Sequence, residues 1–149
     1  MREITGNIWV YYRIPNSYIC IPINTDVKLN GRAVMARGIA ARAKRAIPGI
    51  DLTLGRLIRN NRPFANYCVL VVPGIITFKT QNHWFEPSTL DIIQRSAMAL
   101  RAVARAEPHS HFYLSRPGCG NGGLRWEDVR PIIAPLLPDN VYVVSKAGQ

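Results

Sequence analysis

A glycine-rich segment at residues 115–126 constrains the fold of this chain more than any other feature. Residues 111–114 before it are strand-like, and the apolar residues after it recur at helical spacing. Four glycines fall within six residues of this segment, at Gly118, Gly120, Gly122 and Gly123. Glycine lets backbone N–H groups approach an anion closely, and the positive end of a helix dipole adds to the attraction. The pattern predicts a strand, a phosphate-binding loop and a helix, with a glycine-rich tight turn as the alternative.

The charge of the chain favours an anionic partner. The 149 residues carry a formal net charge of +10, and most of the basic residues are arginine. Guanidinium groups bind phosphate in a bidentate manner, so we expect an anionic ligand or a nucleic-acid contact through a basic surface. A basic face that is only solvated is the alternative.

Length and hydropathy predict one globular domain over residues 1–149. The chain is 48% hydrophobic and 19% charged, which argues against disorder. Its longest apolar run, residues 67–78, is interrupted by Pro73-Gly74 and is too short to span a bilayer. The first residues lack the apolar core of a signal peptide. We therefore expect a cytoplasmic protein without membrane contact, and the sequence leaves its oligomeric state open.

The cysteines and histidines give no metal-binding pattern. Cys20, Cys68 and Cys119 form no CxxC pair, and His83, His109 and His111 have no partners at ligand spacing. We expect neither a disulfide framework nor a metal, and no cofactor.

The rest of the chain alternates strand-like and helical segments. Strands are expected at residues 4–12, 18–23, 67–72, 75–78, 111–114 and 141–144. Helices are expected from near Gly38 to Ala46, over 51–60, from a capping box at 88–91 to about 105, and after the glycine loop. Residues 61–66 are expected to form a loop, and residues 145–149 a frayed tail. The order predicts an α/β fold, a three-layer α/β/α sandwich with a mixed central sheet.

Short motifs along nearly the whole chain resemble those of the macrodomain family, whose members bind ADP-ribose. The motifs are Gly6-Asn7-Ile8, Asn24, residues 35–40, Thr80-Gln81-Asn82-His83-Trp84, and residues 118–124 with Trp126. The resemblance is strongest to the branch that contains the terminal ADP-ribose glycohydrolase and the antitoxin that removes ADP-ribose from DNA. It implies a macrodomain-like sandwich and an ADP-ribose or ADP-ribosylated partner.

The resemblance also implies a position for each ligand-binding residue. Asn7 and Ile8 would lie beside the adenine, and Asn24 would face the distal ribose. Residues from two loops would enclose the diphosphate and distal ribose, with Thr80 nearby. These are Arg37, Gly38, Ile39 and Ala40 on one side, and Gly118, Cys119, Gly120, Asn121, Gly122, Gly123 and Leu124 on the other.

The catalytic position departs from the family pattern. The segment before His83-Trp84 usually reads Thr-Lys in this branch, and the lysine is catalytic, whereas this chain has Gln81. An amide is neither a lysine nucleophile nor a cation. Lys79, which an extended strand would point to the same face, and His83, a general base, are the candidates to assist Gln81. The aspartate in the glycine loop of the terminal glycohydrolase falls on Gly122.

Together these residues imply a protein that binds ADP-ribose or an ADP-ribosyl group and hydrolyses it from modified nucleic acid or protein. One alternative is a non-catalytic ADP-ribose-binding module or sponge, and another is an ADP-ribose 1''-phosphate phosphatase. A generic nucleic-acid binder leaves the glycine loop unexplained, and the sequence shows no aromatic stacking platform for a single strand.

Overall fold

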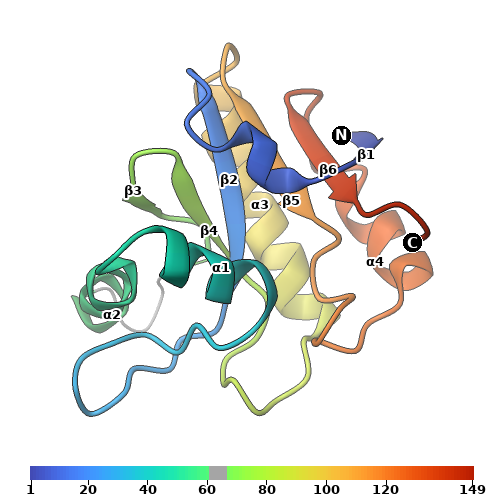
Figure 1. Ribbon diagram of the computed structural model, residues 1–149. Coiled ribbons are helices and arrows are strands. Elements are labelled where there is room, and N and C mark those ends of the chain that lie inside the picture. Colours follow the sequence, from blue (N-terminus) through green and yellow to red (C-terminus); the bar gives the residue numbers. More distant parts are fainter. Residues whose placement is uncertain (61–66) are drawn as a thin grey trace.

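A six-stranded mixed sheet forms the centre of the fold in the computed structural model, which describes residues 1–60 and 67–149 (Figure 1). The strands are β1 (Arg2–Thr5), β2 (Ser17–Ile23), β3 (Leu70–Val72), β4 (Ile75–Lys79), β5 (His111–Ser115) and β6 (Val141–Ser145). Their order across the sheet is β1-β6-β5-β2-β4-β3. All neighbouring strands are parallel except β3, which runs antiparallel to β4. The C-terminal ends of the five parallel strands therefore meet at one edge.

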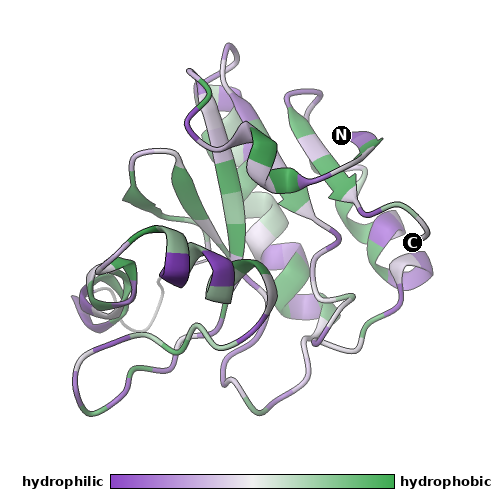
Figure 2. Cartoon of the chain, in the orientation of Figure 1, coloured by the Kyte–Doolittle hydropathy of each residue, from purple (hydrophilic) through white to green (hydrophobic). Residues whose placement is uncertain are grey.

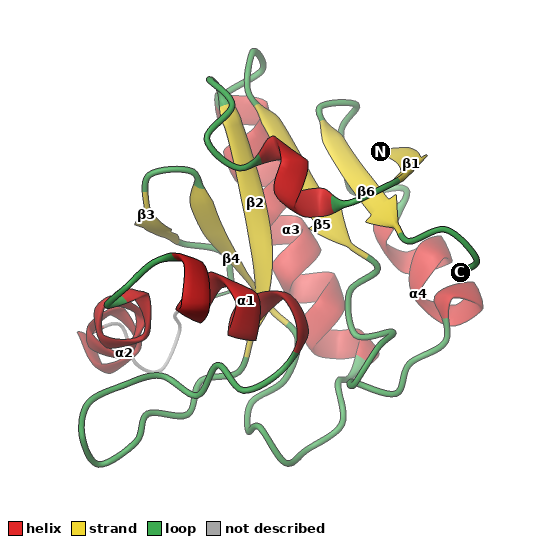
Figure 3. Ribbon diagram, in the orientation of Figure 1, coloured by secondary structure: helices red, strands yellow, loops and turns green. Residues whose placement is uncertain are grey.

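Helices cover both faces of this sheet (Figure 3). They are α1 (Gly38–Ala46), α2 (Ile50–Asn60), α3 (Leu90–Ala106) and α4 (Trp126–Ile133), with a 3-10 helix, η1 (Ile8–Tyr11). On one face, α1 contacts β2, α2 contacts β3 and η1 contacts β2 and β5. On the other face, α3 contacts β4 and packs against α4. The predicted three-layer sandwich is confirmed.

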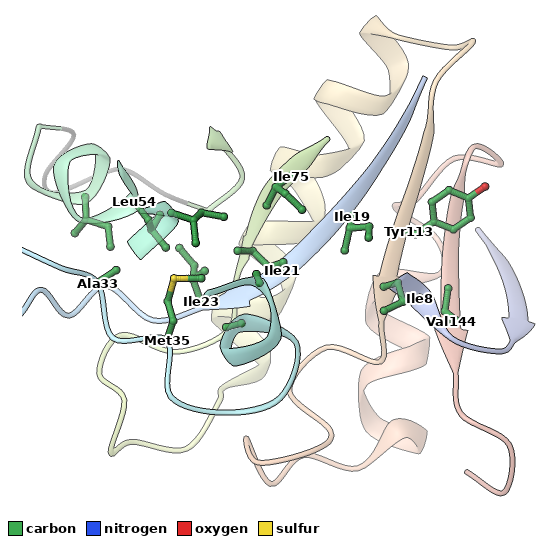
Figure 4. Close-up of a cluster of buried hydrophobic side chains, with 14 residues drawn as sticks. Ile8, Ile19, Ile21, Ile23, Ala33, Met35, Leu54, Ile75, Tyr113 and Val144 are labelled. Atoms are coloured by element: carbon green, nitrogen blue, oxygen red, sulfur yellow. The ribbon is translucent and has the colours of Figure 1, made fainter. Parts of the chain in front are cut away.

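The central strand β2 is buried on both faces because its side chains alternate between two apolar clusters. Ile19, Ile21 and Ile23 belong to the cluster under α1 and α2, shown in Figure 4. Cys20 belongs to the cluster under α3 and α4. Figure 2 shows the same apolar character along the middle of the sheet. A strand between two helical layers is apolar almost throughout, so the prediction for residues 18–23 is confirmed.

The predicted strand at residues 4–12 is wrong in its second half. β1 ends at Thr5, and η1 follows from Ile8. Between them Gly6 has a φ of 154°, and the Asn7 side chain accepts a hydrogen bond from the Trp9 N–H at 3.0 Å. This cap satisfies an N–H that a strand would have paired with a neighbour, and the chain turns into a helical conformation.

Other predicted boundaries change by a few residues. α1 begins at Gly38 as expected, with a φ of 56°. β3 begins at Leu70, so the predicted strand at 67–72 is too long, and the predicted loop at 61–66 lies outside the described residues. The cap of α3 is Thr89, whose hydroxyl accepts the Ile92 N–H at 3.3 Å, not Ser88 as the predicted capping box required. Within residues 1–60 and 67–149, no helix is long and apolar enough to cross a bilayer.

Candidate functional site

A cleft of about 820 Å³ lies at the edge where the parallel strands end. Its wall includes Ile23 at the end of β2 and Asn24 after it, Thr80 after β4, and Ser115 at the end of β5. Crevices outside the carboxyl ends of parallel strands are the usual ligand sites of open α/β sheets. The volume is within the range of roughly 300–1,000 Å³ typical of small-molecule sites.

Most residues predicted to bind ligand line this cleft. They are Asn7, Ile8, Asn24, Arg37, Gly38, Ile39, Ala40, Thr80, Gly118, Cys119, Gly120, Asn121 and Gly122, together with Gln81. Four predicted residues are not part of the lining: Lys79, His83, Gly123 and Leu124. The structure thus brings together segments that are more than a hundred residues apart in the chain.

The N-terminus of α1 contributes free backbone donors to the cleft. Gly38, Ile39 and Ala40 form the first turn of α1 and line the wall. Within the described part of the chain, no side chain caps this helix, and its first turn holds no acidic residue. The unsatisfied N–H groups and the positive end of the helix dipole make this turn a site for an anion.

The glycine loop forms the opposite wall, but α4 does not extend to the cleft. Gly118 has a φ of 74°, and its carbonyl accepts the Leu124 N–H at 2.9 Å. Leu124 packs in the cluster under α3 and α4, which explains its absence from the lining. α4 begins only at Trp126, which also lies outside the wall. This wall is therefore formed by the loop itself, without the dipole of α4.

A buried serine lies directly beneath the glycine loop. Ser88 donates its N–H to the Gly122 carbonyl at 3.0 Å, but its buried hydroxyl has no hydrogen-bond partner among the described residues. A Cβ added at Gly122 would lie 2.2 Å from the Ser88 Oγ and 2.7 Å from the Gly118 carbonyl oxygen. Any larger residue at position 122, including the aspartate implied for the terminal glycohydrolase, therefore requires the loop to move.

Five cationic side chains line the cleft: Arg37, Arg42, Arg45, Arg116 and Lys146. None of them takes part in an ion pair within the described residues, and no aspartate or glutamate is found among the lining residues described. A concave wall of one charge sign concentrates ions of the opposite charge. The cleft therefore suits a ligand with several negative charges.

Part of this wall comes from the C-terminal tail, which was not predicted to take part in it. Residues 145–149 were predicted to fray, yet Lys146, Ala147 and Gln149 line the cleft. Gln149 holds this tail in a turn, because its side-chain oxygen accepts the Lys146 N–H at 2.6 Å. Arg42 and Arg45 belong to a basic stretch on α1, and they also line the cleft. The sequence did not show which way their side chains point.

Lys79 lies away from the cleft. Its side chain is buried, with the Nζ 4.8 Å from the centre of the Tyr67 ring. Burial, and then the nearby charge of Arg95, lower the pKa of its ammonium. β4 ends at this residue, so the strand alternation that would place Lys79 beside Gln81 does not continue. The structure does not bring the predicted substitute for the family lysine to the cleft.

Gln81 has a structural contact as well as a place in the cleft wall. Its side-chain N–H donates to the Glu86 carbonyl and closes a loop, residues 81–86, between β4 and α3. Thr25 donates both its N–H and its hydroxyl to the Asn82 carbonyl, each at 3.0 Å. The loop is therefore fixed to the segment that follows β2.

His83 is half-exposed, lies outside the cleft lining and is held by Asp26. The His83 Nδ1 is 2.7 Å from one Asp26 oxygen, and the Trp84 N–H donates to the other at 2.8 Å. The hydrogen bond to Asp26 is the largest influence that raises the pKa of the His83 imidazole. This arrangement stabilises an imidazolium, and it does not present His83 to the cleft as a general base.

We expect the Asp26→Asn substitution to lower the pKa of His83 toward about 6.5, the ordinary value. Because the folded-state pKa is raised, His83 stabilises the fold below its unfolded pKa, and this contribution is lost as the pH rises through the raised pKa. An NMR titration of the His83 ring measures the shift. Asp91→Asn, which alters an exposed ion pair on α3, is the control. An unchanged His83 pKa in Asp26→Asn contradicts the assignment.

Cys119 is in the wall as a neutral thiol. Burial raises its pKa to about 11, and its Sγ lies 3.5 Å from the Pro117 carbonyl oxygen. In the described part of the chain, no group of three or more His, Cys, Asp or Glu side chains is arranged to hold a metal ion. The cleft wall therefore supplies groups that bind anions. Neither the Gln81 amide nor the neutral Cys119 thiol can act as a general base.

Comparisons with known proteins agree with this geometry, although no protein-family model matches the chain. A curated DNA ADP-ribosyl glycohydrolase of Mycobacterium tuberculosis is 32% identical over an alignment of 121 residues, and the match covers 74% of this chain and 34% of that protein. The macrodomain of M. tuberculosis DarG has 27% identity and a TM-score of 0.75, with 95% of each chain covered. Thermosipho africanus DarTG, solved in complex with ADP-ribose, has a TM-score of 0.73 and covers 97% of this chain and 41% of that one. Its 17% identity shows the fold alone.

The chain spans about a third of the length of the curated relatives that it matches. Its likeness to a DarG macrodomain, in contrast, extends over nearly all of both chains. The fold, the cleft between the α1 N-terminus and the glycine loop, and these sequence relationships lead to one conclusion: the chain belongs to the macrodomain family.

Proposed function

We propose that this macrodomain binds ADP-ribosyl groups through its cleft. The observation that carries the proposal is the convergence of the uncapped α1 N-terminus and the glycine loop on a wall rich in cations. A diphosphate with two negative charges matches these donors. The adenine side would lie against Asn7 and Ile8, at the start of η1.

DNA is the carrier that we favour for the ADP-ribosyl group. The curated relatives are DNA ADP-ribosyl glycohydrolases, and the chain carries a net charge of +10. Electrostatic attraction to phosphates would hold any nucleic acid and carries no sequence information. ADP-ribosylated protein is the competing carrier and is included in the test below.

Hydrolysis of the ADP-ribosyl group is the second candidate function, favoured by the glycohydrolase activity in the relatives' name. The family lysine is replaced by Gln81, and the described lining includes no carboxylate. Turnover by this chain would rely on bound water and backbone dipoles. Binding therefore has the stronger structural support.

The test is calorimetry with ADP-ribose, together with a release assay on ADP-ribosylated DNA and protein. We expect binding near micromolar Kd, about 8 kcal/mol of binding free energy, with slow or no release by the unmodified chain. Gln81→Lys should gain release, because it places an amine in the cleft wall. Absence of any heat with ADP-ribose would reject the proposed ligand.

Gln81→Met is the matched control for the lysine variant. It removes the hydrogen bond to the Glu86 carbonyl without adding an amine. Release by Gln81→Met as well as by Gln81→Lys would mean that loosening the loop, not the amine, restores activity. Rapid release by the unmodified chain would favour the hydrolase, and phosphate release from ADP-ribose 1''-phosphate would identify a phosphatase.

A further inference from the structure

Two large aromatic side chains are exposed at the mouth of the cleft, on the loop between β4 and α3. Trp84 is 53% exposed and lines the cleft, and Phe85 beside it is 68% exposed. Their rings meet edge to face at 5.8 Å, and the His83 ring lies parallel to Phe85 at 5.4 Å. We call His83, Trp84 and Phe85 the aromatic rim. Figure 1 shows this yellow-green loop projecting from the edge of the sheet where the cleft lies.

Several polar contacts fix the aromatic rim in this exposed position. Asp26 holds both the His83 ring and the Trp84 N–H, at 2.7 and 2.8 Å. The Glu86 N–H donates to the His83 carbonyl at 3.1 Å, and Gln81 closes the loop. Leaving a large apolar side chain in water forgoes about 1.5–3 kcal/mol of burial free energy. A rigid loop that presents such rings is typical of a binding surface.

The charge around the aromatic rim indicates what binds there. The neighbouring cleft wall carries five cationic side chains, which disfavour an apolar protein surface and favour a polyanion. Flat aromatic rings beside a cationic wall form the kind of surface that binds single-stranded nucleic acid. The bases stack on the rings, and the phosphates lie along the cationic side chains. The two carboxylates at the rim, Asp26 and Glu86, both lie against the His83 imidazole, at 2.7 and 3.9 Å. Their repulsion of a phosphate is thereby reduced.

We propose that the aromatic rim stacks on a nucleobase that flanks the ADP-ribosylated nucleotide of a single strand. The inference rests on the proposed function, since it needs the ADP-ribosyl group in the cleft to bring the strand to the rim. Bases of a duplex are stacked on each other and hidden, so the rim selects unpaired nucleic acid over paired nucleic acid. No stacking platform was predicted from the sequence, because the exposure of Trp84 and Phe85 is set by the contacts of their loop with Asp26.

The test compares Phe85→Ala with the unmodified chain, because Phe85 lies outside the cleft lining. Kd is measured for free ADP-ribose, an ADP-ribosylated single-stranded oligonucleotide, the same oligonucleotide in a duplex, and an ADP-ribosylated peptide. Stacking on one ring contributes about 1–3 kcal/mol, so affinity for the single strand should fall roughly 5- to 150-fold. Free ADP-ribose and the peptide should bind as before. Phe85→Tyr should restore the single-strand affinity, and Trp84→Ala should also weaken it.

Leu29→Ala is the control, because Leu29 is a fully exposed apolar side chain outside the cleft lining. It should leave all four affinities unchanged. Equal single-strand affinity in Phe85→Ala and the unmodified chain overturns the stacking proposal, as does an equal loss for the peptide. A matching loss for free ADP-ribose also overturns it, by showing that the loop was disturbed. Failure of the unmodified chain to bind free ADP-ribose is a separate result, which rejects the proposed function itself.

Discussion

Gly122→Ala is expected to reduce affinity for ADP-ribose at least tenfold, about 1.4 kcal/mol. The added Cβ would lie 2.7 Å from the Gly118 carbonyl oxygen and 2.9 Å from the Ser88 Cβ. A hydroxyl can rotate away, but a backbone carbonyl cannot, and this carbonyl already accepts the Leu124 N–H. The loop must therefore shift, and its N–H groups then lose their alignment on the diphosphate.

Gly120→Ala is the matched control in the same loop. A Cβ at Gly120 would have no described atom within 4 Å, and its φ is not in the left-handed region. Because Gly120 lines the cleft, an added methyl reduces the room for a ligand, but the loop keeps its shape, so we expect a smaller loss of affinity than for Gly122→Ala. Calorimetry with ADP-ribose measures both variants, and circular dichroism verifies that both fold. Equal affinities for Gly120→Ala and Gly122→Ala would contradict the close packing of Gly122 as the cause.

Gly55→Ala is expected to destabilise the fold by about 3 kcal/mol or more. Gly55 lies inside α2, where alanine alone would add about 1 kcal/mol of helix stability. The added Cβ, however, would lie 2.0 Å from the Gly31 carbonyl oxygen and 3.2 Å from the Ala33 backbone nitrogen. Both atoms belong to the backbone, so the loop before α1 must separate from α2. The steric cost therefore exceeds the gain in helix propensity.

Urea unfolding of Gly55→Ala measures this loss as a lower midpoint. Arg56→Ala is the control, because Arg56 is exposed on the next position of the same helix. It should change the free energy of unfolding by about 0.5 kcal/mol or less. A urea midpoint for Gly55→Ala at or above that of the unmodified chain would contradict this prediction. It would show that the loop at Gly31 and Ala33 can move away without loss of stability.

The regular elements followed from the sequence where local chemistry and burial agree. The strand β2 was predicted because it is buried on both faces, which gives an almost continuous apolar run. The helix α3 was predicted because it buries one continuous apolar stripe. The four glycines also predicted a close-approach loop, and the motifs predicted which residues meet in the cleft. The elements and the loop depend on the nearest residues in the chain, which a single sequence displays, whereas the set of residues in the cleft followed from the family resemblance and is only partly matched by the lining.

The chemistry of the site depended on contacts between distant segments. Whether Lys79 reaches the cleft was decided by the end of β4 and by burial against Tyr67. The exposure of Trp84 and Phe85 follows from contacts of their loop with Asp26, more than fifty residues earlier. The sequence by itself thus determined the sandwich and its glycine-rich loop. Only the tertiary structure decided which charged side chains line the cleft and which aromatic side chains are exposed beside it, because their directions are set by packing partners remote in the chain.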